Sequence, residues 1–138
     1  MKKVVYIDDE INSSKMESKI DSILKEIEIE IIKIDSVEDA MAALQSVINQ
    51  ISLIILDIIM PPEDKYSLEE TNGGTTTGLR LLKEIRKLYP NVPIMIISIK
   101  RKDRLTEIIN AFNVSEFLEK PISGKEIGQH IKRLIVKS

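Results

Sequence analysis

The chain alternates between short aliphatic segments and longer stretches with the periodicity of amphipathic helices. The short segments are rich in β-branched residues and apolar on both faces, which is typical of strands in parallel sheets. The alternation therefore predicts an α/β fold, a doubly wound five-stranded parallel sheet with right-handed crossovers and five helices. The expected strands lie at 3–7, 27–34, 53–56, 92–98 and 116–119, and the expected helices at 12–27, 36–48, 78–88, 105–112 and 123–135.

Two of the expected strands end in carboxylates. Asp57 directly follows the run Ser52–Leu56, and Asp8 and Asp9 follow the first strand. Ligands of open parallel sheets bind at the carboxyl ends of strands, and the strand order 2-1-3-4-5 would bring these two strand ends together. A plain turn residue ahead of the Pro61-Pro62 pair is the alternative role for Asp57.

Composition narrows the classes of function. The length of 138 residues, with 43% hydrophobic and 30% charged residues, predicts one globular domain spanning 1–138. A net charge of −2 gives no basic excess for nucleic-acid binding, and the absence of cysteine excludes disulfides and thiolate sites. No segment resembles a signal peptide or membrane span, so we expect a cytoplasmic protein with no membrane partner.

Other strand ends supply further polar groups. Ser98 ends the fourth strand and Lys120 follows the fifth. Neighbouring carboxylates repel one another, and a hard divalent cation such as Mg²⁺ relieves that repulsion. An aspartate beside Mg²⁺ can act as a nucleophile toward phosphorus, while an ammonium and a hydroxyl stabilise the phosphoryl oxygens.

These strand ends, together with the Met60-Pro61 and Lys120-Pro121 pairs, resemble the receiver domain of bacterial two-component response regulators, which has a flavodoxin-like fold. The resemblance covers nearly the whole chain and implies that Asp57 is the phosphoacceptor. It also implies a cis Lys120-Pro121 bond. The implied roles of the other residues are Mg²⁺ ligation by Asp9, Asp57 and the Ile59 carbonyl, a water-mediated role for Asp8, a switch hydroxyl at Ser98, phosphate pairing by Lys120 and a switch aromatic at Phe117.

The chain departs from the family pattern after Asp57. The glycine that matches the family's is Gly78, which leaves an acidic insertion at about 62–77 whose Gly73–Thr77 stretch is typical of a mobile turn. The insertion is either a tolerated surface loop or a flap over the phosphorylation site, with Tyr66 or Leu68 as anchor.

Three other features bear on access and partners. Ile99 stands where receivers usually have a small residue, and its bulk would narrow access to Asp57. The basic run Lys100–Arg104 is either a solvated loop or part of a partner surface. His130 falls off the apolar stripe of the last helix and is expected at the surface.

Two segments have the form of capping boxes, in which a serine and an acidic residue three positions later satisfy the first N–H groups of a helix. They are Ser36 to Asp39 and Ser123 to Glu126.

The sequence therefore predicts a stand-alone receiver that takes a phosphoryl group from a histidine kinase or phosphotransfer protein onto Asp57 and slowly hydrolyses it. It would not be an enzyme beyond this self-phosphorylation and autodephosphorylation. Its output would be contact with a protein target through helix 4, strand 5 and helix 5, with no direct nucleic-acid contact. The alternative is a receiver-like binding module independent of phosphorylation. An aspartate-nucleophile phosphatase would need an acidic residue two positions after its nucleophile, and this chain has Ile59 there.

Overall fold

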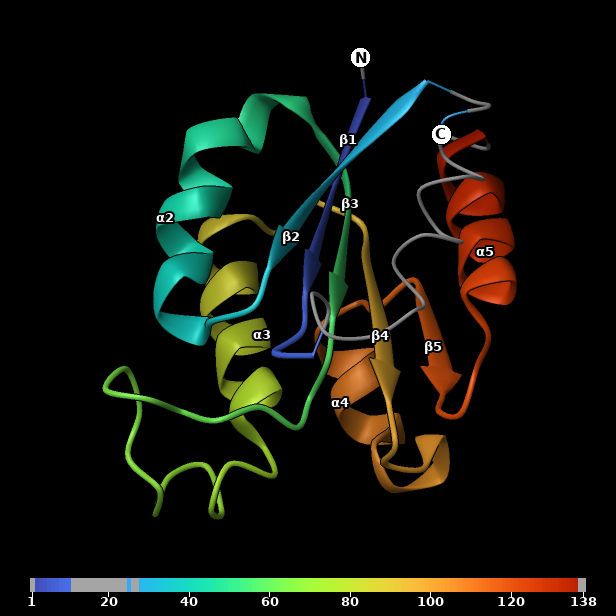
Figure 1. The fold of residues 1–138 in the computed structure, drawn as a ribbon. Coiled ribbons are helices and arrows are strands. Elements are labelled where there is room, and N and C mark those ends of the chain that lie inside the picture. Colours follow the sequence, from blue (N-terminus) through green and yellow to red (C-terminus); the bar gives the residue numbers. More distant parts are fainter. Residues whose placement is uncertain (1, 11–24, 26–27, 137–138) are drawn as a thin grey trace.

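The computed structural model describes residues 2–10, 25 and 28–136 of the chain. Its centre is a parallel sheet with the strand order β2-β1-β3-β4-β5 (Figure 1). The predicted order is confirmed, with the alternating Ile/Glu segment at one edge. The strands are β1 (Lys2–Ile7), β2 (Ile29–Ile34), β3 (Ile51–Leu56), β4 (Ile94–Ser98) and β5 (Glu116–Glu119).

Four helices and two 3-10 turns are described. They are α2 (Val37–Val47), η1 (Ile48–Gln50), α3 (Thr77–Leu88), η2 (Lys102–Arg104), α4 (Thr106–Ala111) and α5 (Gly124–Val136). The helix expected at 12–27 lies outside the described residues. Within the described residues, no helix combines the length and the apolar character needed to cross a membrane.

Both faces of the sheet are buried, as the uninterrupted apolar strands predict. Side chains alternate between two clusters along each central strand. One cluster packs Val5, Ile7, Ile54 and Leu56 against α2, α3 and α4, and the other packs Val4, Tyr6, Leu53 and Ile55 against α5 (Figure 1). Each fully buried aliphatic side chain stabilises the fold by about 1.5–3 kcal/mol. The carboxyl ends of the central strands are thereby held on a rigid support.

The two capping boxes have different outcomes. At α5 the serine half of the predicted box is confirmed, because the Glu126 N–H donates to Ser123 Oγ at 3.1 Å. At α2 it is wrong, since Ser36 makes no side-chain cap of its own. The Ser36 hydroxyl instead donates to Glu63 Oε1 at 2.8 Å, and the same oxygen accepts the Val37 N–H at 3.1 Å. The helix is thus capped from the insertion, 26 residues along the chain.

The inserted segment folds around a buried threonine. The Thr71 hydroxyl donates to the Ser67 carbonyl at 2.8 Å, and the Thr71 carbonyl accepts the Thr76 N–H at 3.0 Å. The carbonyl of Gly74, a residue at φ 92°, accepts the Met60 N–H at 3.2 Å and ties the end of the insertion to the segment that follows β3. The stretch expected to be a mobile turn is therefore hydrogen-bonded into a compact loop.

A second contact fixes the loop to α3. The Tyr66 hydroxyl donates to Glu84 Oε2 at 2.5 Å, and Lys65 Nζ lies 3.2 Å from Glu84 Oε1. The guanidinium of Arg80 lies 5.9 Å from the centre of the Tyr66 ring. Tyr66 thus anchors the loop, as the flap hypothesis expected. It holds the loop to α3, however, and does not cover Asp57.

Candidate functional site

The ends of β1 and β3 bring three carboxylates together. The two strands pair in parallel with Ile7 opposite Leu56, and the Asp57 N–H donates to the Ile7 carbonyl at 3.0 Å. Carboxylate oxygens of Asp8, Asp9 and Asp57 consequently lie within 4.8 Å of one another. Asp8 and Asp57 are only 4% and 5% exposed, whereas Asp9 is exposed.

Lys120 completes this group from the end of β5. Its Nζ lies 3.0 Å from Asp57 Oδ2 and 3.2 Å from Asp8 Oδ2. Its backbone N–H donates to the Ser98 carbonyl at 2.8 Å, which ties the end of β5 to that of β4. The Lys120-Pro121 bond is cis, as the resemblance implies. The side chain thus bridges two of the three carboxylates.

The electrostatics of the group favour an additional cation. Burial in the first place, and the charge of Asp8 in the second, raise the pKa of Asp57 to about 6 despite the opposing effect of Lys120. Burial, Asp8 and Glu10 also raise the pKa of Asp9. Burial acts to lower the pKa of Lys120, but the charges of Asp57 and Asp8 outweigh it and raise that pKa. One ammonium therefore does not fully compensate the carboxylates.

The donor set fits a hard divalent cation. All three side chains offer carboxylate oxygens, the ligand type that Mg²⁺ prefers, and one of the three is exposed and accessible to a hydrated ion. Part of the set is already oriented, because Asp8 Oδ1 accepts the Glu10 N–H at 3.0 Å and Asp57 Oδ1 accepts the Ile59 N–H at 3.3 Å. Ile59 itself lines the space beside Asp57.

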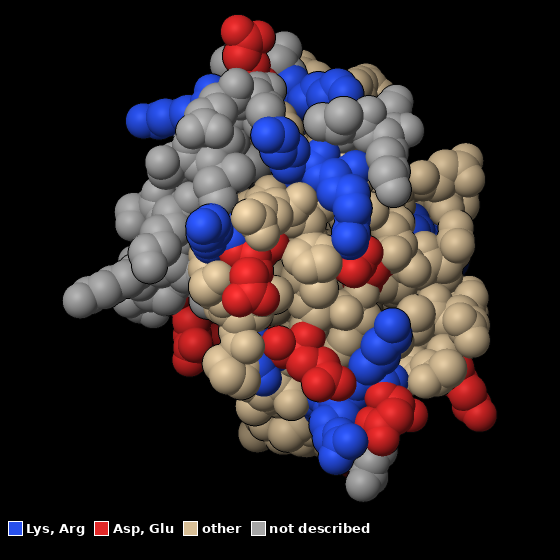
Figure 2. All heavy atoms as spheres, turned by 90° about the vertical axis from the view of Figure 1, so that its right-hand side faces the viewer, with Lys and Arg blue, Asp and Glu red and all other residues tan. Residues whose placement is uncertain are grey.

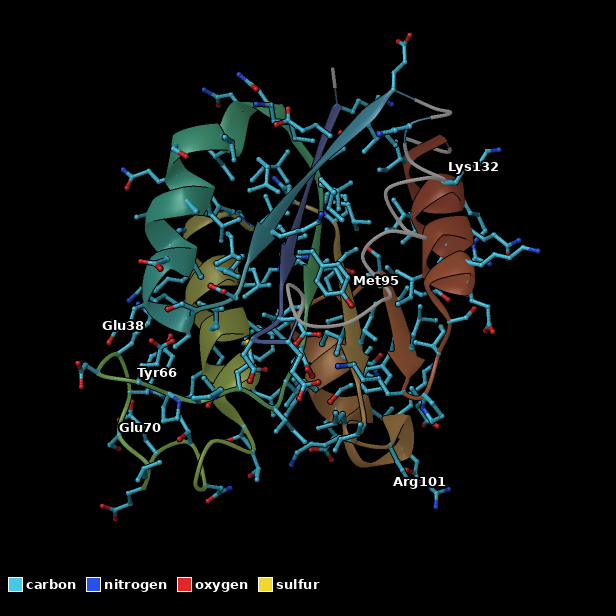
Figure 3. The ribbon with its side chains drawn as sticks, in the orientation of Figure 1. Glu38, Tyr66, Glu70, Met95, Arg101 and Lys132 are labelled. Atoms are coloured by element: carbon cyan, nitrogen blue, oxygen red, sulfur yellow. The ribbon has the colours of Figure 1, made fainter. Side chains whose placement is uncertain are left out.

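This space is a cleft of about 510 Å³ at the carboxyl edge of the sheet. Three parts of the chain line the cleft: the strand ends, the inserted loop and the segment after β4. They are Asp9, Glu10, Asp57, Ile59, Met60, Pro61, Pro62, Leu68, Gly73, Gly74, Ile99 and Lys120. The loop is thus a wall of the cleft, and Ile99 stands at its mouth, 65% exposed. Figure 3 shows Glu70 of the loop and Arg101 after β4 on opposite flanks of this edge.

The two residues expected to switch are buried beside the cleft edge of the sheet, in β4 and β5. Ser98 is fully buried at the end of β4, and its hydroxyl oxygen accepts the Lys100 N–H at 3.3 Å. Phe117, in β5, is 7% exposed and packs in the cluster beneath α3 and α4. The residues that line the cleft include neither side chain.

Sequence reasoning missed several residues around the site. Tyr6 is fully buried two positions before Asp8, and burial, then Asp8 and Asp57, raise its pKa. The two-residue period of a strand places Tyr6 and Asp8 on one face, so the sequence pattern could have predicted that Tyr6 lies near the site. Glu63 and Glu84, which hold the loop, left no local signal in the sequence. His130, expected at the surface, is half-buried on α5, with its Nδ1 3.4 Å from Glu116 Oε1.

Comparison with known proteins identifies the family. A model of the response regulator receiver domain matches residues 4–132. The chain is a member of the receiver-domain family. This receiver is 25% identical over its full 138 residues to the transcriptional regulatory protein CpxR homolog of Haemophilus influenzae. It is also 23% identical over 99 residues, or 72% of the chain, to the sensor kinase CckA of Brucella abortus. The receiver spans 52% of the first relative and 9% of the second.

Solved structures share its fold. The chemotaxis protein CheY4 of Vibrio cholerae superposes with a TM-score of 0.72 at 22% identity, with 97% of this receiver and 98% of that chain covered. A two-component response regulator from Clostridium difficile gives a TM-score of 0.71 at 23% identity, with 99% and 98% covered. The arrangement of strands and helices is therefore that of other receivers.

Proposed function

We propose that this receiver accepts a phosphoryl group on Asp57 from the phosphohistidine of a histidine kinase or phosphotransfer protein in the cytoplasm. The observation that carries the proposal is the environment of the Asp57 carboxylate. It lies in a cleft, 3.0 Å from Lys120 Nζ and within 4.8 Å of the oxygens of Asp8 and Asp9. A nucleophile, a cation and a candidate metal site thus share one accessible space.

In the proposed reaction an Asp57 carboxylate oxygen attacks phosphorus. The new O–P bond forms as the P–N bond to the donor imidazole breaks, and the leaving nitrogen keeps the electron pair and takes up a proton from solvent. A pKa of about 6 leaves Asp57 largely ionised at neutral pH, as a nucleophile must be. Lys120 faces the incoming charge and pairs with a phosphoryl oxygen. Later attack of water on phosphorus releases inorganic phosphate and restores the carboxylate.

The metal site would use Asp9, Asp57 and the Ile59 carbonyl directly, and Asp8 largely through water. Bound Mg²⁺ supplies positive charge to the phosphoryl oxygens. The protein's own contribution is to hold these oxygens together. Asp8 is fixed by Glu10 and Lys120, and Asp57 by Ile59 and Lys120.

The signal would pass by a change at β4 and β5. In the proposal the Ser98 hydroxyl leaves the Lys100 N–H and donates to the phosphoryl group, and Phe117 moves into the space left behind. A protein target would read the resulting change on α4, β5 and α5. On the side of the molecule that carries α5, Figure 2 shows acidic and basic side chains interleaved among uncharged ones. An ion pair joins two of these elements, since a guanidinium nitrogen of Arg133 in α5 lies 2.8 Å from Glu116 Oε2 in β5.

The test is intact-mass measurement after incubation with Mg²⁺ and acetyl phosphate or phosphoramidate. We expect an adduct of about 80 Da, one phosphoryl group. Asp57→Asn should abolish it, and Asp103→Asn, which removes an exposed carboxylate on η2, should retain it. An adduct that persists in Asp57→Asn would refute the assignment of the acceptor.

Two other functions make different predictions in the same experiment. A receiver-like binding module that does not use phosphorylation would give no adduct with any donor; the inserted loop and Ile99 at the cleft mouth favour this second candidate. A phosphatase with an aspartate nucleophile would turn over external phosphoesters. Such an enzyme needs an acidic residue two positions after its nucleophile, and the apolar Ile59 at that position argues against this function.

A further inference from the structure

One buried polar atom lacks a hydrogen-bond partner. Among the residues that the structure describes, the Tyr6 hydroxyl oxygen is the one buried side-chain polar atom that makes no hydrogen bond. Tyr6 is fully buried in the cluster beneath α5, which also contains Met95, labelled in Figure 3. Burying a hydroxyl without a partner costs free energy, and a phenylalanine would fill the same space without that cost. Packing alone therefore does not explain why this residue is a tyrosine.

The position of Tyr6 in β1 places it behind the carboxylates. Successive side chains of a strand alternate between its faces, so Tyr6 and Asp8 lie on one face, about 6–7 Å apart along the strand. Ile55 of β3 pairs with Tyr6, and Asp57, two residues after Ile55, therefore lies on the same face. Both carboxylates are close enough to act on the hydroxyl, since after burial their charges are the next causes that raise its pKa.

Asp8 depends on Lys120 in the unphosphorylated protein. Asp8 is 4% exposed, so water contributes little to the stability of its charge. Its Oδ1 accepts the Glu10 N–H at 3.0 Å, and its Oδ2 lies 3.2 Å from Lys120 Nζ. The same ammonium lies 3.0 Å from Asp57 Oδ2. Two buried carboxylates therefore share one side-chain cation.

Phosphorylation would change this sharing. In the proposed reaction Lys120 pairs with a phosphoryl oxygen on Asp57, and this contact draws the ammonium away from Asp8. Asp8 Oδ2 is then a buried carboxylate oxygen that has lost part of its compensation, which is costly. A phenol keeps its proton at neutral pH and can donate it in a hydrogen bond. Tyr6 therefore has an uncommitted donor on the face where one is needed.

We propose that Tyr6 is a positioning residue, whose hydroxyl donates a hydrogen bond to Asp8 when Lys120 turns from Asp8 to the phosphoryl group. The inference rests on the proposed function of Asp57. The bond is charge-assisted, and it forms only after phosphorylation, so it stabilises the phosphorylated state relative to the unphosphorylated one. Tyr6 does not touch the phosphoryl group and acts through Asp8.

Beryllofluoride, a stable analogue of the phosphoryl group, allows a test at equilibrium. With Mg²⁺ present, we expect Tyr6→Phe to weaken the binding of beryllofluoride about tenfold, the factor that one hydrogen bond to a charged group contributes. Titration calorimetry measures this affinity. The matched control is Tyr89→Phe, which removes the hydroxyl of a half-buried tyrosine at the end of α3 and should keep the wild-type affinity.

Two further measurements separate positioning from a purely structural role. A phenol that begins to donate to a carboxylate absorbs at longer wavelength. Beryllofluoride should therefore produce a difference band in the tyrosine absorption of the wild type and of Tyr89→Phe, but not of Tyr6→Phe. In urea unfolding without beryllofluoride, Tyr6→Phe should be at least as stable as the wild type, because the hydroxyl has no hydrogen bond to lose.

The outcomes distinguish this inference from the proposed function. If the wild type neither binds beryllofluoride nor forms an adduct with acetyl phosphate, Asp57 is rejected as acceptor, and the role of Tyr6 is rejected with it. Equal affinity in the wild type and Tyr6→Phe, or a difference band that persists in this variant, would overturn the role of Tyr6 alone. A loss of stability in Tyr6→Phe without beryllofluoride would also overturn it, because the hydroxyl would then already have a partner, such as a buried water.

Discussion

At the scale of single residues, Asp57 combines two conflicting requirements. The nucleophile that we propose must be ionised, yet the carboxylate is 5% exposed beside a second buried carboxylate. Lys120 offsets the repulsion in part, since its Nζ lies 3.0 Å from Asp57 and 3.2 Å from Asp8. The remaining imbalance appears as a pKa of about 6 for Asp57. When no cation is bound, ionised Asp57 therefore lowers the stability of the fold.

A stability measurement should reveal this imbalance. The folded-state pKa of Asp57 is raised above its unfolded value near 4, so the stability contributed by protonation is fully present below pH 4 and is lost as pH rises through 6. In metal-free buffer, Asp57→Asn should therefore raise the free energy of unfolding by about 2–3 kcal/mol at pH 7.5 and change it little at pH 4. Urea titrations at both pH values test this, with Asp103→Asn as control. A variant less stable than the wild type at pH 7.5 would contradict it.

Gly78 lies directly against the backbone of Asp57 and Ile58. Its N–H donates to the Ile58 carbonyl at 2.7 Å, and a Cβ at this position would overlap the Asp57 carbonyl oxygen and lie 2.5 Å from the Ile58 Cα. Both neighbours are backbone atoms and cannot rotate away. The close approach of α3 to the end of β3 thus requires glycine here, which accounts for its place at the start of α3, after the insertion.

We expect Gly78→Ala to disturb the site and the fold together. Forcing backbone apart in a packed region costs about 1–3 kcal/mol, so the midpoint of urea unfolding should fall. Because the displaced atoms belong to Asp57 and its neighbour, labelling by acetyl phosphate should slow as well. Wild-type stability and labelling in this variant would show that α3 adjusts without cost.

At the scale of elements, the inserted loop is a structural unit with two attachments. Glu63 caps α2, and Tyr66 with Lys65 holds Glu84 of α3. Glu63 adopts a φ of 52°, in the left-handed region that non-glycine residues rarely occupy. Its interaction with the positive end of the α2 dipole offsets that cost. The loop therefore bridges two helices on one face of the sheet.

The attachment to α3 should weaken in acid. Burial acts to raise the pKa of Glu84, but the hydrogen bonds from Tyr66 and Lys65 outweigh it and lower that pKa. A lowered folded-state pKa contributes stability above the unfolded value near 4.3, and this stability is lost as pH falls through the folded pKa. Glu84→Gln should therefore weaken the contact at pH 7 and matter less at pH 3. The effect is about 0.5 kcal/mol, because Glu84 is partly exposed and solvent screens the pair.

Hydrogen exchange is the suitable measurement for so local a change. The N–H groups of Lys65 and Tyr66 both donate to the Pro62 carbonyl, at 3.2 and 3.3 Å. Their exchange should be faster in Glu84→Gln than in the wild type at pH 7, while Glu69→Gln, which changes an exposed glutamate of the loop, should leave it unchanged. Equal exchange in all three proteins would show that Glu84 does not hold the loop.

At the scale of the whole molecule, the sequence predicted what depends on local pattern. Five apolar runs with intervening helical periodicity predict a doubly wound parallel sheet, and the order 2-1-3-4-5, one of the common orders of such sheets, is the one observed. That order alone places Asp8 beside Asp57. The capping of α2 by Glu63 and the pairing of Tyr66 with Glu84 were not predictable, because they join residues 26 and 18 positions apart. Such contacts depend on the path of the inserted loop, which no periodic pattern in the sequence specifies.

The proposed magnesium site would link the residues at the sheet edge to the stability of the whole domain. A cation that binds only the folded chain stabilises it by about 1.4 kcal/mol at ten times its dissociation constant, which corresponds to roughly 4 °C in Tm. Thermal unfolding with and without Mg²⁺ should show this shift in the wild type and in Asp103→Asn. It should be absent in Asp9→Asn, because Asp9 is the exposed member of the three carboxylates. A shift retained in Asp9→Asn would place the ion elsewhere, and no shift in the wild type at any Mg²⁺ concentration would remove the metal from the proposed reaction.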